Sequence, residues 1–152
     1  MTSVARLGAW ELDEALPLIA AYQRFYEVEP DEARNAVFFR RFVDSDAEGT
    51  LLGLRDDDGA LIGYACLHWR LDTVVAHEVV CLHDLFVVPE SRGIGAGRAL
   101  LEAAAHVARA RGAAALVWST APDNTTAQRL YDATGAARSS WYEYELPTHP
   151  SM

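Results

Sequence analysis

Residues 82–98 read LHDLFVVPESRGIGAGR and combine an apolar segment with a glycine-rich one. Its first part, residues 82–88, is mostly apolar and is typical of a strand that Pro89 ends. Its second part places three glycines between Arg92 and Arg98, directly before a segment with helical spacing. Glycines allow positive φ and close backbone approach, and the start of a helix presents unpaired N–H groups and a positive dipole end. The stretch therefore predicts a strand, a pyrophosphate-binding turn and a helix, in that order.

Two better-known phosphate-binding motifs do not fit this loop. A dinucleotide-binding fingerprint needs a third glycine at position 98, which is Arg98, and no strand-helix-strand unit with a suitably placed acid follows. A P-loop needs a lysine, and all 13 basic residues of the chain are arginines. The remaining alternative is a glycine-rich turn without a ligand. The flanking arginines favour an anion site over that alternative.

The pattern on either side of the loop predicts a mixed sheet with helices on its faces. Upstream, Asp13 and Asp31 are placed to cap two helices, and the Asp58-Gly59 pair between apolar runs indicates a hairpin. Downstream, the apolar stretch after Gly112 suits a buried central or parallel strand. The expected strands are 3–9, 50–55, 60–71, 78–88, 114–120 and 141–146, and the expected helices are 13–26, 31–43, the segment from the glycine loop to 111, and 124–135. The fold class is therefore α/β (α+β), in a single domain over residues 1–152.

The 152 residues carry 22 acids and 13 bases, a formal net charge of −9. Residues 1–60 hold 13 acids and six arginines, whereas residues 61–152 hold nine acids and seven arginines. This charge disfavours binding to nucleic acid or an anionic membrane, and the second part tolerates an anion better than the first. Cys66 and Cys81 lie in apolar runs, as buried free thiols do. Without a bilayer-spanning apolar run or a signal-like start, a cytoplasmic protein is expected.

Two motifs resemble those of the GNAT superfamily of acetyl-CoA-dependent N-acetyltransferases. The superfamily's loop, Arg/Gln-x-x-Gly-x-Gly/Ala after a strand ending in Val-x-Pro, is matched by Arg92, Gly95 and Gly97 after Val87-Val88-Pro89. Its last-helix pattern, Asn-x-x-Ala-x-x-x-Tyr-x-x-x-Gly, is matched by Asn124, Ala127, Tyr131 and Gly135. The resemblance implies a mixed, mostly antiparallel sheet of six to seven strands flanked by about four helices.

The resemblance also implies acetyl-CoA as co-substrate, without a metal. Backbone N–H groups of the glycine loop are expected to hold the diphosphate, and the preceding strand to pair with the pantetheine amides. An N–H of that strand can also stabilise charge on the thioester carbonyl oxygen. The cofactor-binding residues implied are Leu85, Phe86, Val87, Arg92, Gly93, Ile94, Gly95, Ala96, Gly97, Arg98, Asn124 and Ala127.

The last helix carries two candidate functional side chains on one face. Asn124 either bonds to pantetheine or caps the helix, and Thr125-x-x-Gln128 offers a separate capping box. Tyr131, seven residues after Asn124, shares its face. As a phenol it can protonate the leaving thiolate, since free phenols and thiols have pKa values of about 10 and about 8.5. The alternative for Tyr131 is a packing residue.

The stretch that contains His83 and Asp84 looks like the spermidine/spermine (diamine) acetyltransferase branch. That branch has a glutamate acting through water at the position of His83, so the general base here is His83, Asp84 or a water chain. A neutral histidine suits proton removal near pH 7. In a regular strand His83 and Asp84 point to opposite faces, so only one is expected to line the site.

The acceptor is expected to meet acids and aromatic rings. The candidates at the first helices are Tyr22, Phe25, Tyr26, Glu27 and Glu29, and Trp118 comes from the fifth strand. With Asp84, Tyr26, Glu27 and Trp118 are the candidate substrate-binding residues, because carboxylates and ring faces attract a cation. Whether Glu27 and Glu29 line the site or form a solvated helix end stays open.

The function expected is transfer of an acetyl group from acetyl-CoA to a primary amine of a small cationic acceptor. The amine attacks directly in a ternary complex, with Tyr131 and His83 as catalytic residues. The alternatives are a non-catalytic acyl-CoA-binding or regulatory module of the same fold, and an acetyltransferase of a protein or peptide amine. The resemblance suggests a homodimer.

Overall fold

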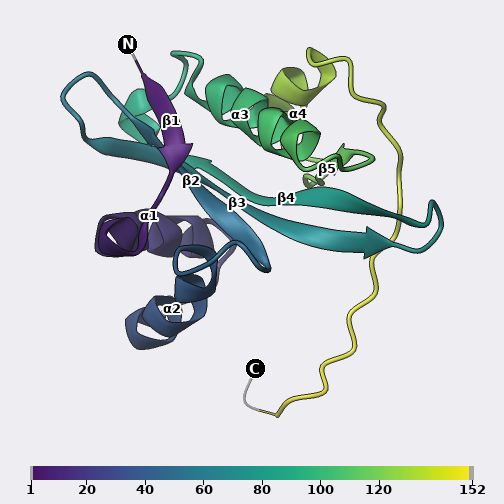
Figure 1. The fold of residues 1–152 in the computed structure, drawn as a ribbon, viewed down its shortest axis with the longest axis horizontal. Helices are drawn as coiled ribbons and strands as arrows, with labels where there is room; N and C mark the ends of the chain where they lie inside the picture. The colour runs from purple at the N-terminus through teal and green to yellow at the C-terminus, as the bar shows by residue number, and fades with distance from the viewer. Residues whose placement is uncertain (1, 151–152) are drawn as a thin grey trace. The chain divides into compact units, whose positions relative to one another are not determined.

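A computed structural model describes residues 2–150. The chain divides into two compact units, with the boundary between Ser119 and Thr120, and each is described by itself. The first unit is built on a five-stranded sheet in the order β1-β2-β3-β4-β5 (Figure 1). Its strands are β1 Ser3–Arg6, β2 Gly49–Arg55, β3 Leu61–Asp72, β4 His77–Val87 and β5 Leu116–Val117. Strands β1 to β4 are antiparallel to one another in turn, and β5 runs parallel to β4.

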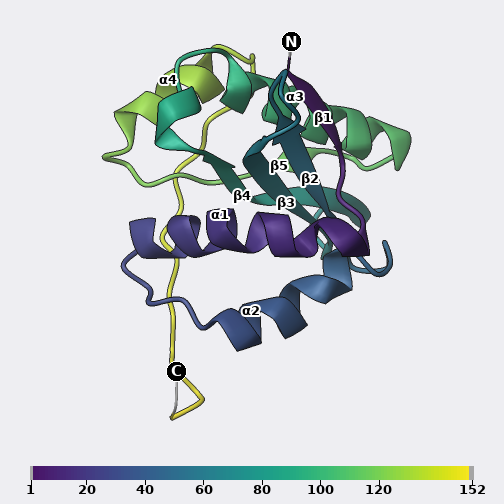
Figure 2. The ribbon, with the colours of Figure 1, turned by 90° about the vertical axis from the view of Figure 1, so that its left-hand side faces the viewer.

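Three α-helices cover this sheet. They are α1 Leu12–Phe25, α2 Glu32–Phe39 and α3 Ala96–Ala110, with short 3₁₀ turns η1 Ala9–Glu11, η2 Arg40–Phe42 and η3 Pro89–Ser91. Helices α1 and α2 lie on one face of the sheet and α3 on the other (Figures 1 and 2). The α/β class with a mostly antiparallel sheet is therefore confirmed, although residues 2–150 form a sheet of five strands rather than six or seven.

The second unit contains α4, Thr125–Asp132. The strand predicted at 141–146 is wrong, because the structure assigns no strand to this segment. Trp141, Tyr142, Tyr144 and Leu146 are all 84% exposed or more. Alternation of side chains favours a strand only where a neighbouring strand accepts its backbone hydrogen bonds, and the segment has no ladder partner among the described residues.

One hydrophobic core cluster lies between the sheet and the α1–α2 layer, and α3 buries residues such as Leu100 and Ala104 on its own side of the sheet. Ala15 and Ile19 of α1 are fully buried against Leu51 of β2 and Tyr64 of β3. Phe86 of β4 belongs to the same cluster. The spacing of four between Ala15 and Ile19 places both on one helix face, which is why α1 packs flat on the sheet.

A reciprocal amide pair joins α1 to α2. Gln23 donates to Asn35 Oδ1 at 2.9 Å, and Asn35 donates to Gln23 Oε1 at 2.8 Å. Asn35 is buried, and the pair satisfies its amide. Asp31 caps α2 as predicted, by accepting from the Arg34 N–H at 2.9 Å. Asp13 does not cap α1, because the 3₁₀ turn η1 begins the helical segment earlier.

Arg55, at the end of β2, ties the sheet to the start of α1. It donates to Glu11 Oε2 and Glu14 Oε2 at 2.7 Å each, and to the Gly59 carbonyl of the following turn at 2.9 Å. The backbone N–H of Gly8, followed by Arg55, lowers the pKa of Glu11. The Arg55 guanidinium likewise lowers the pKa of Glu14.

The fifth strand is shorter and less buried than predicted. The expected strand 114–120 is reduced to Leu116–Val117, and both residues are half-buried. They pair with Val80 and Cys81 at the edge of the described sheet, so of the two alternatives, a central or a parallel strand, the parallel one is confirmed. An apolar run does not distinguish an edge strand from a central one.

We predict that Gly49→Ala destabilises the protein by about 3 kcal/mol through overpacking. A Cβ at Gly49 would clash with the carbonyl oxygen of Leu67 and lie 2.8 Å from Cα of His68, and both are backbone atoms of β3. The control is Gly59→Ala, where φ is +82° and nothing lies within 4 Å of the added Cβ. Its cost is about 1 kcal/mol of left-handed strain. Urea unfolding measures both, and equal losses would contradict the prediction.

Candidate active site

The glycine loop forms the turn that the sequence predicts. Gly93 and Gly95 have φ of +85° and +83°, a conformation that side chains with a Cβ rarely adopt. Gly95 is the N-cap of α3, and the first hydrogen bond of the helix runs from the Ala99 N–H to the Gly95 carbonyl. The N–H groups of Ala96, Gly97 and Arg98 precede it and have no partner within the helix. They form a concentrated set of donors at the positive end of the α3 dipole.

The two arginines beside the loop have partners within the chain. Arg92 donates through Nε to the Val87 carbonyl at 3.0 Å, and its guanidinium carbon lies 5.7 Å from the centroid of the Phe86 ring. Arg98 pairs with Glu102 one helical turn later, at 3.0 Å and in solvent. Arg92 thus fastens the loop to the end of β4. The donors that the loop itself provides are the backbone N–H groups.

A β-bulge separates the register of β4 into two halves. Cys66 of β3 pairs with Asp84, but the next residue, Leu67, pairs with Leu82, so that His83 is the extra residue. The prediction that His83 and Asp84 point to opposite faces is therefore wrong, because a bulge breaks the alternation of a regular strand. Their side chains instead contact each other, with His83 Nδ1 lying 3.0 Å from Asp84 Oδ1.

The second carboxylate oxygen of Asp84 accepts a hydrogen bond from a buried phenol. Tyr64 Oη donates to Asp84 Oδ2 at 3.1 Å, and Tyr64 has no exposed surface. Burial, followed by the charge of Asp84, raises the pKa of Tyr64 far above its usual range. The phenol therefore keeps its proton and acts as a donor.

Aromatic rings lie beside the group formed by Tyr64, Asp84 and His83. Tyr22 of α1 donates to the carbonyl of His83 at 3.3 Å, and its ring lies 6.1 Å from Tyr64 and 6.4 Å from Phe86. Tyr26, one turn later and half exposed, lies 5.1 Å from Tyr22. The structure thus brings predicted residues Tyr26, His83, Asp84 and Phe86 together around Tyr22.

The remaining acceptor candidates are less confined. Glu27 and Glu29 are exposed just beyond the end of α1, and Glu27 has a φ of +60°, in the left-handed region. Trp118 lies one residue past β5 and is half-buried. The carboxylates of Glu27 and Glu29 therefore lie on the surface just beyond the end of α1, close in sequence to Tyr22 and Tyr26.

Sequence reasoning missed two residues of this group, Tyr64 and His68. The His68 ring lies 5.5 Å from the His83 ring, centroid to centroid. Burial, followed by the nearby His83 and Arg70, lowers the pKa of His68. Both missed residues lie on β3, across the ladder from β4. Only the exact register of this strand pair, including the bulge, brings them to His83 and Asp84.

In the second unit, Asn124 is the N-cap of α4. Its Oδ1 accepts from the Ala127 N–H at 3.2 Å. The predicted capping box at Thr125 is wrong, because Gln128 donates instead to the carbonyls of Ala121 and Pro122. The cap uses only the side-chain oxygen of Asn124, whose amide group also carries two donors. Asn124, Ala127 and Tyr131 are all half-buried, which agrees with the shared helix face.

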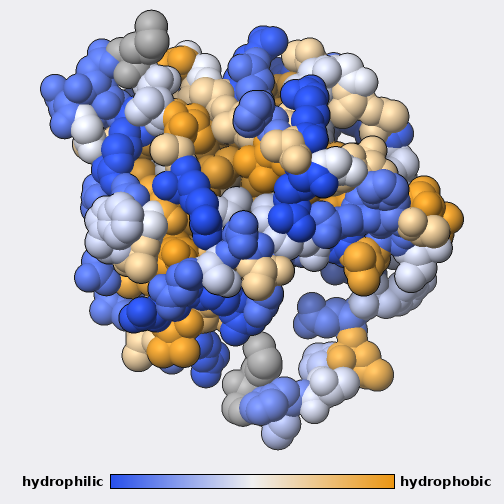
Figure 3. Space-filling view, in the orientation of Figure 1, coloured by the Kyte–Doolittle hydropathy of each residue, from blue (hydrophilic) through white to orange (hydrophobic). Residues whose placement is uncertain are grey.

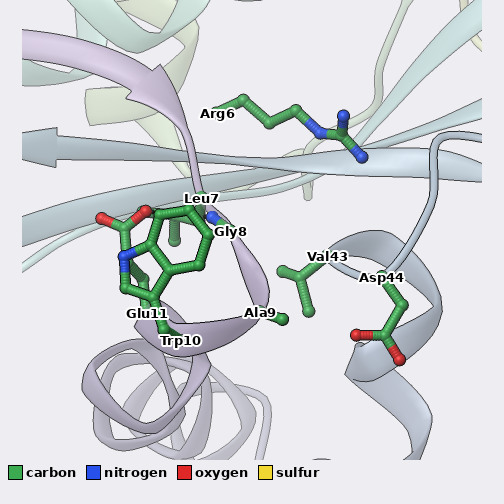
Figure 4. Close-up of a pocket in the computed structure, with 8 residues that line it drawn as sticks. All are labelled: Arg6, Leu7, Gly8, Ala9, Trp10, Glu11, Val43 and Asp44. Carbon is green, nitrogen blue, oxygen red and sulfur yellow. Dashed lines mark hydrogen bonds between the residues drawn. The ribbon is translucent and has the colours of Figure 1, made fainter.

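Other surface features do not coincide with this group. A hollow of about 510 Å³ lies where β1 leads into η1 (Figure 4), and none of the predicted site residues lines it. On the face drawn in Figure 3, hydrophilic and apolar side chains are interspersed.

Within residues 2–150, no helix has both the length and the apolar character needed to cross a membrane. The described residues also contain no group of three or more His, Cys, Asp or Glu suited to a metal.

Comparison with known proteins gives a consistent result. Residues 15–136 match the model of the acetyltransferase (GNAT) family. An uncharacterized N-acetyltransferase, YhfO of Bacillus subtilis (strain 168), is 32% identical over 119 residues, which cover 78% of each chain. The crystal structure of a probable acetyltransferase superposes with a TM-score of 0.85 at 24% identity, covering 97% of this chain and 98% of that one. The aminoglycoside N-acetyltransferase AAC(6')-Iy, solved in complex with CoA, superposes with a TM-score of 0.83 at 20% identity, covering 98% and 96%.

Proposed function

The chain belongs to the acetyltransferase (GNAT) family, and on that premise we propose that it transfers an acetyl group from acetyl-CoA to a primary amine of a small cationic acceptor. The observation that carries the acceptor side of this proposal is the exposed His83 imidazole, 3.0 Å from a buried carboxylate and beside the tyrosines of α1. The transfer is a direct attack in a ternary complex.

The glycine loop fits the diphosphate of acetyl-CoA. A Cβ built on Gly93 or Gly95 meets nothing within 4 Å, so the backbone of this turn is open to close approach. The N–H groups of Ala96, Gly97 and Arg98 suit an anion at the start of α3. Strand residues Leu85–Val87 and the Asn124–Ala127 face of α4 are the proposed partners of pantetheine. When bound, the cofactor supplies an acetyl thioester and a thiolate leaving group.

His83 is the proposed general base. An amine attacks only when neutral, whereas a lysine-like amine has a pKa of about 10.4, so a group must take its proton. The imidazole removes it and leaves the electron pair on nitrogen for attack on the acetyl carbon. Tyr131 is the proposed acid, which donates its phenolic proton to the departing thiolate.

The proposed acceptor is a cation because of what surrounds His83. Tyr22 and Tyr26 supply aromatic rings, whose faces attract cations, and Glu27 and Glu29 add negative charge just beyond the end of α1. The net charge of −9 acts in the same direction at longer range. The diamine branch, a homodimer and a cytoplasmic location remain predictions.

We expect thiol release from acetyl-CoA in the presence of at least one small polyamine or aminoglycoside amine. His83→Ala should reduce this rate mainly below about pH 8, where the free amine is scarce. The control is His106→Ala, since His106 is exposed on α3. Calorimetric binding of acetyl-CoA without turnover of any amine would favour a binding module, and turnover of peptide amines alone would favour a peptide acetyltransferase.

A matched pair of glycine variants tests the cofactor loop. Gly95 and Gly112 flank α3, with φ of +83° and +69° and no atom within 4 Å of an added Cβ. Both changes to alanine impose the same kind of backbone strain. Only Gly95→Ala should weaken acetyl-CoA binding, by about tenfold, because it displaces the N–H donors; this corresponds to about one charge-assisted hydrogen bond. Equal affinities of the two variants would contradict the loop assignment.

Tyr131→Phe tests the acid. Loss of a positioned proton donor typically costs about 10²-fold or more in turnover, so we expect a fall in kcat of that order. The Kd of acetyl-CoA should change by less than about twofold, because the ring is kept. Tyr142→Phe is the control, since Tyr142 is 92% exposed. If Tyr131→Phe has the kcat of the wild type, Tyr131 is not the acid.

A further inference from the structure

We propose that Asp84 is a positioning residue that fixes the tautomer and orientation of His83, and that Tyr64 holds Asp84 in place for this task. The proposal rests on the proposed function, in which His83 takes the proton of the amine. It assigns Asp84 a role through His83, in place of the substrate-binding role predicted from the sequence.

The three side chains form a hydrogen-bonded path from the core to the surface. Tyr64 is fully buried, the Asp84 side chain is 11% exposed, and the His83 side chain is 68% exposed. Tyr64 Oη lies 3.1 Å from Asp84 Oδ2, and Asp84 Oδ1 lies 3.0 Å from His83 Nδ1. Only the outermost member of the path is open to an acceptor molecule from solvent.

The direction of the hydrogen bonds determines the tautomer. A carboxylate only accepts, so the hydrogen on the Tyr64–Asp84 side comes from the phenol and the hydrogen on the other side comes from His83 Nδ1. In neutral imidazole one nitrogen carries hydrogen and the other accepts. With Nδ1–H directed at Asp84, Nε2 keeps the lone pair that a general base needs.

The same contacts argue against a direct role of Asp84 with the amine. Each of its oxygens is already engaged, one by Tyr64 and one by His83. A nearly buried carboxylate in this state does not reach a cation at the surface. It does stabilise the imidazolium that forms when Nε2 gains the proton, because the negative charge lies beside Nδ1–H.

The surroundings keep His83 in this arrangement. The bulge places His83 and Asp84 side by side, and Tyr22 Oη binds the His83 carbonyl at 3.3 Å. His68 faces the His83 ring, and its lowered pKa favours its neutral form, so it adds little competing positive charge. Among the described residues, the titratable and charged groups around His83 and its partners include Tyr22, Tyr64, Cys66, His68, Arg70 and Cys81.

The proton transfer from the ammonium group to His83 breaks one bond and forms one. The N–H bond of the ammonium acceptor breaks, the Nε2–H bond of His83 forms, and the electron pair stays on the amine nitrogen. No proton moves to Asp84. Its contribution is the orientation of the ring and the attraction between the carboxylate and the imidazolium.

The decisive variant is Asp84→Asn. With the amide oxygen accepting from Tyr64, the NH₂ group faces His83 and donates to Nδ1, which moves the ring hydrogen to Nε2 and removes the base. We expect kcat with the best amine to fall by about 10²-fold, with the Kd of acetyl-CoA within about twofold of wild type. In the pH–rate profile of the residual activity, the acidic limb should disappear or move to lower pH.

Tyr64→Phe keeps the carboxylate and should lower kcat less, by about three- to tenfold. Asp44→Asn, at an exposed carboxylate paired with Arg40, is the control.

A double-variant cycle separates positioning from a direct role. If Asp84 acts through His83, Asp84→Asn should cost little in a His83→Ala background. Equal losses in both backgrounds would assign Asp84 a direct part in binding or proton transfer and overturn the proposal. Wild-type turnover by the Asp84→Asn variant would also overturn it, while leaving the acetyltransferase function intact.

A measurement without turnover keeps the proposal testable where the variant fails to fold or where no amine is acetylated. Nitrogen-15 shifts of His83 in the wild-type protein near pH 8 should show Nδ1 protonated and Nε2 unprotonated. In Asp84→Asn the pattern should reverse. A wild-type His83 with hydrogen on Nε2 would overturn the proposal, whereas absence of any amine turnover by wild-type protein would instead contradict the proposed function.

Discussion

His83 is the extra residue of a bulge in the β3–β4 ladder, and this bulge brings its side chain to that of Asp84. A regular β3–β4 ladder would place His83 and Asp84 on opposite faces, and Asp84 would not meet the imidazole. The single extra residue shifts the register between Cys66 and Leu67. On one side of it the pair of strands continues to the turn at Asp72 and His77, and on the other it carries Tyr64 opposite Phe86. One backbone irregularity thus joins a core tyrosine to a surface histidine.

Stability and chemistry share the residues beyond this bulge. Tyr64 and Phe86 belong to the core cluster with Ile19 and Leu51, so α1 cannot shift on the sheet without disturbing the phenol. A buried hydroxyl costs free energy unless it is hydrogen-bonded, and Asp84 provides that bond. The same bond satisfies one oxygen of a nearly buried carboxylate. The core thus supplies a hydrogen-bond donor to the carboxylate, and the carboxylate in turn contacts the exposed His83 ring.

The sequence predicts those parts of the molecule that follow from local chemistry. Glycines at 93 and 95 require a left-handed turn, and the turn, the helix after it and the antiparallel strands before it are confirmed. The sequence does not reveal features that depend on pairing between distant segments. Nothing in residues 82–85 alone indicates a bulge. The contact of His83 with Asp84, and the positions of Tyr64 and His68 beside them, therefore cannot be derived from the sequence. The same limit explains the wrong strand at 141–146, where the alternation is present but a partner strand is not assigned.

The structure changes the interpretation of the negative charge that the first 60 residues carry. Many acids of the first 60 residues have structural partners: Glu11 and Glu14 bind Arg55, Asp44 binds Arg40, Glu48 binds Arg41, and Asp31 caps α2. Their charges are neutralised locally or held at helix ends, so the excess of acid over base is a poor measure of the attraction felt by an amine. Glu27 and Glu29 are also exposed, and they lie just beyond the end of α1, close in sequence to Tyr22 and Tyr26. In the proposed function, selectivity for a cation would come from these few side chains and from the rings of Tyr22 and Tyr26, with the net charge acting only at longer range.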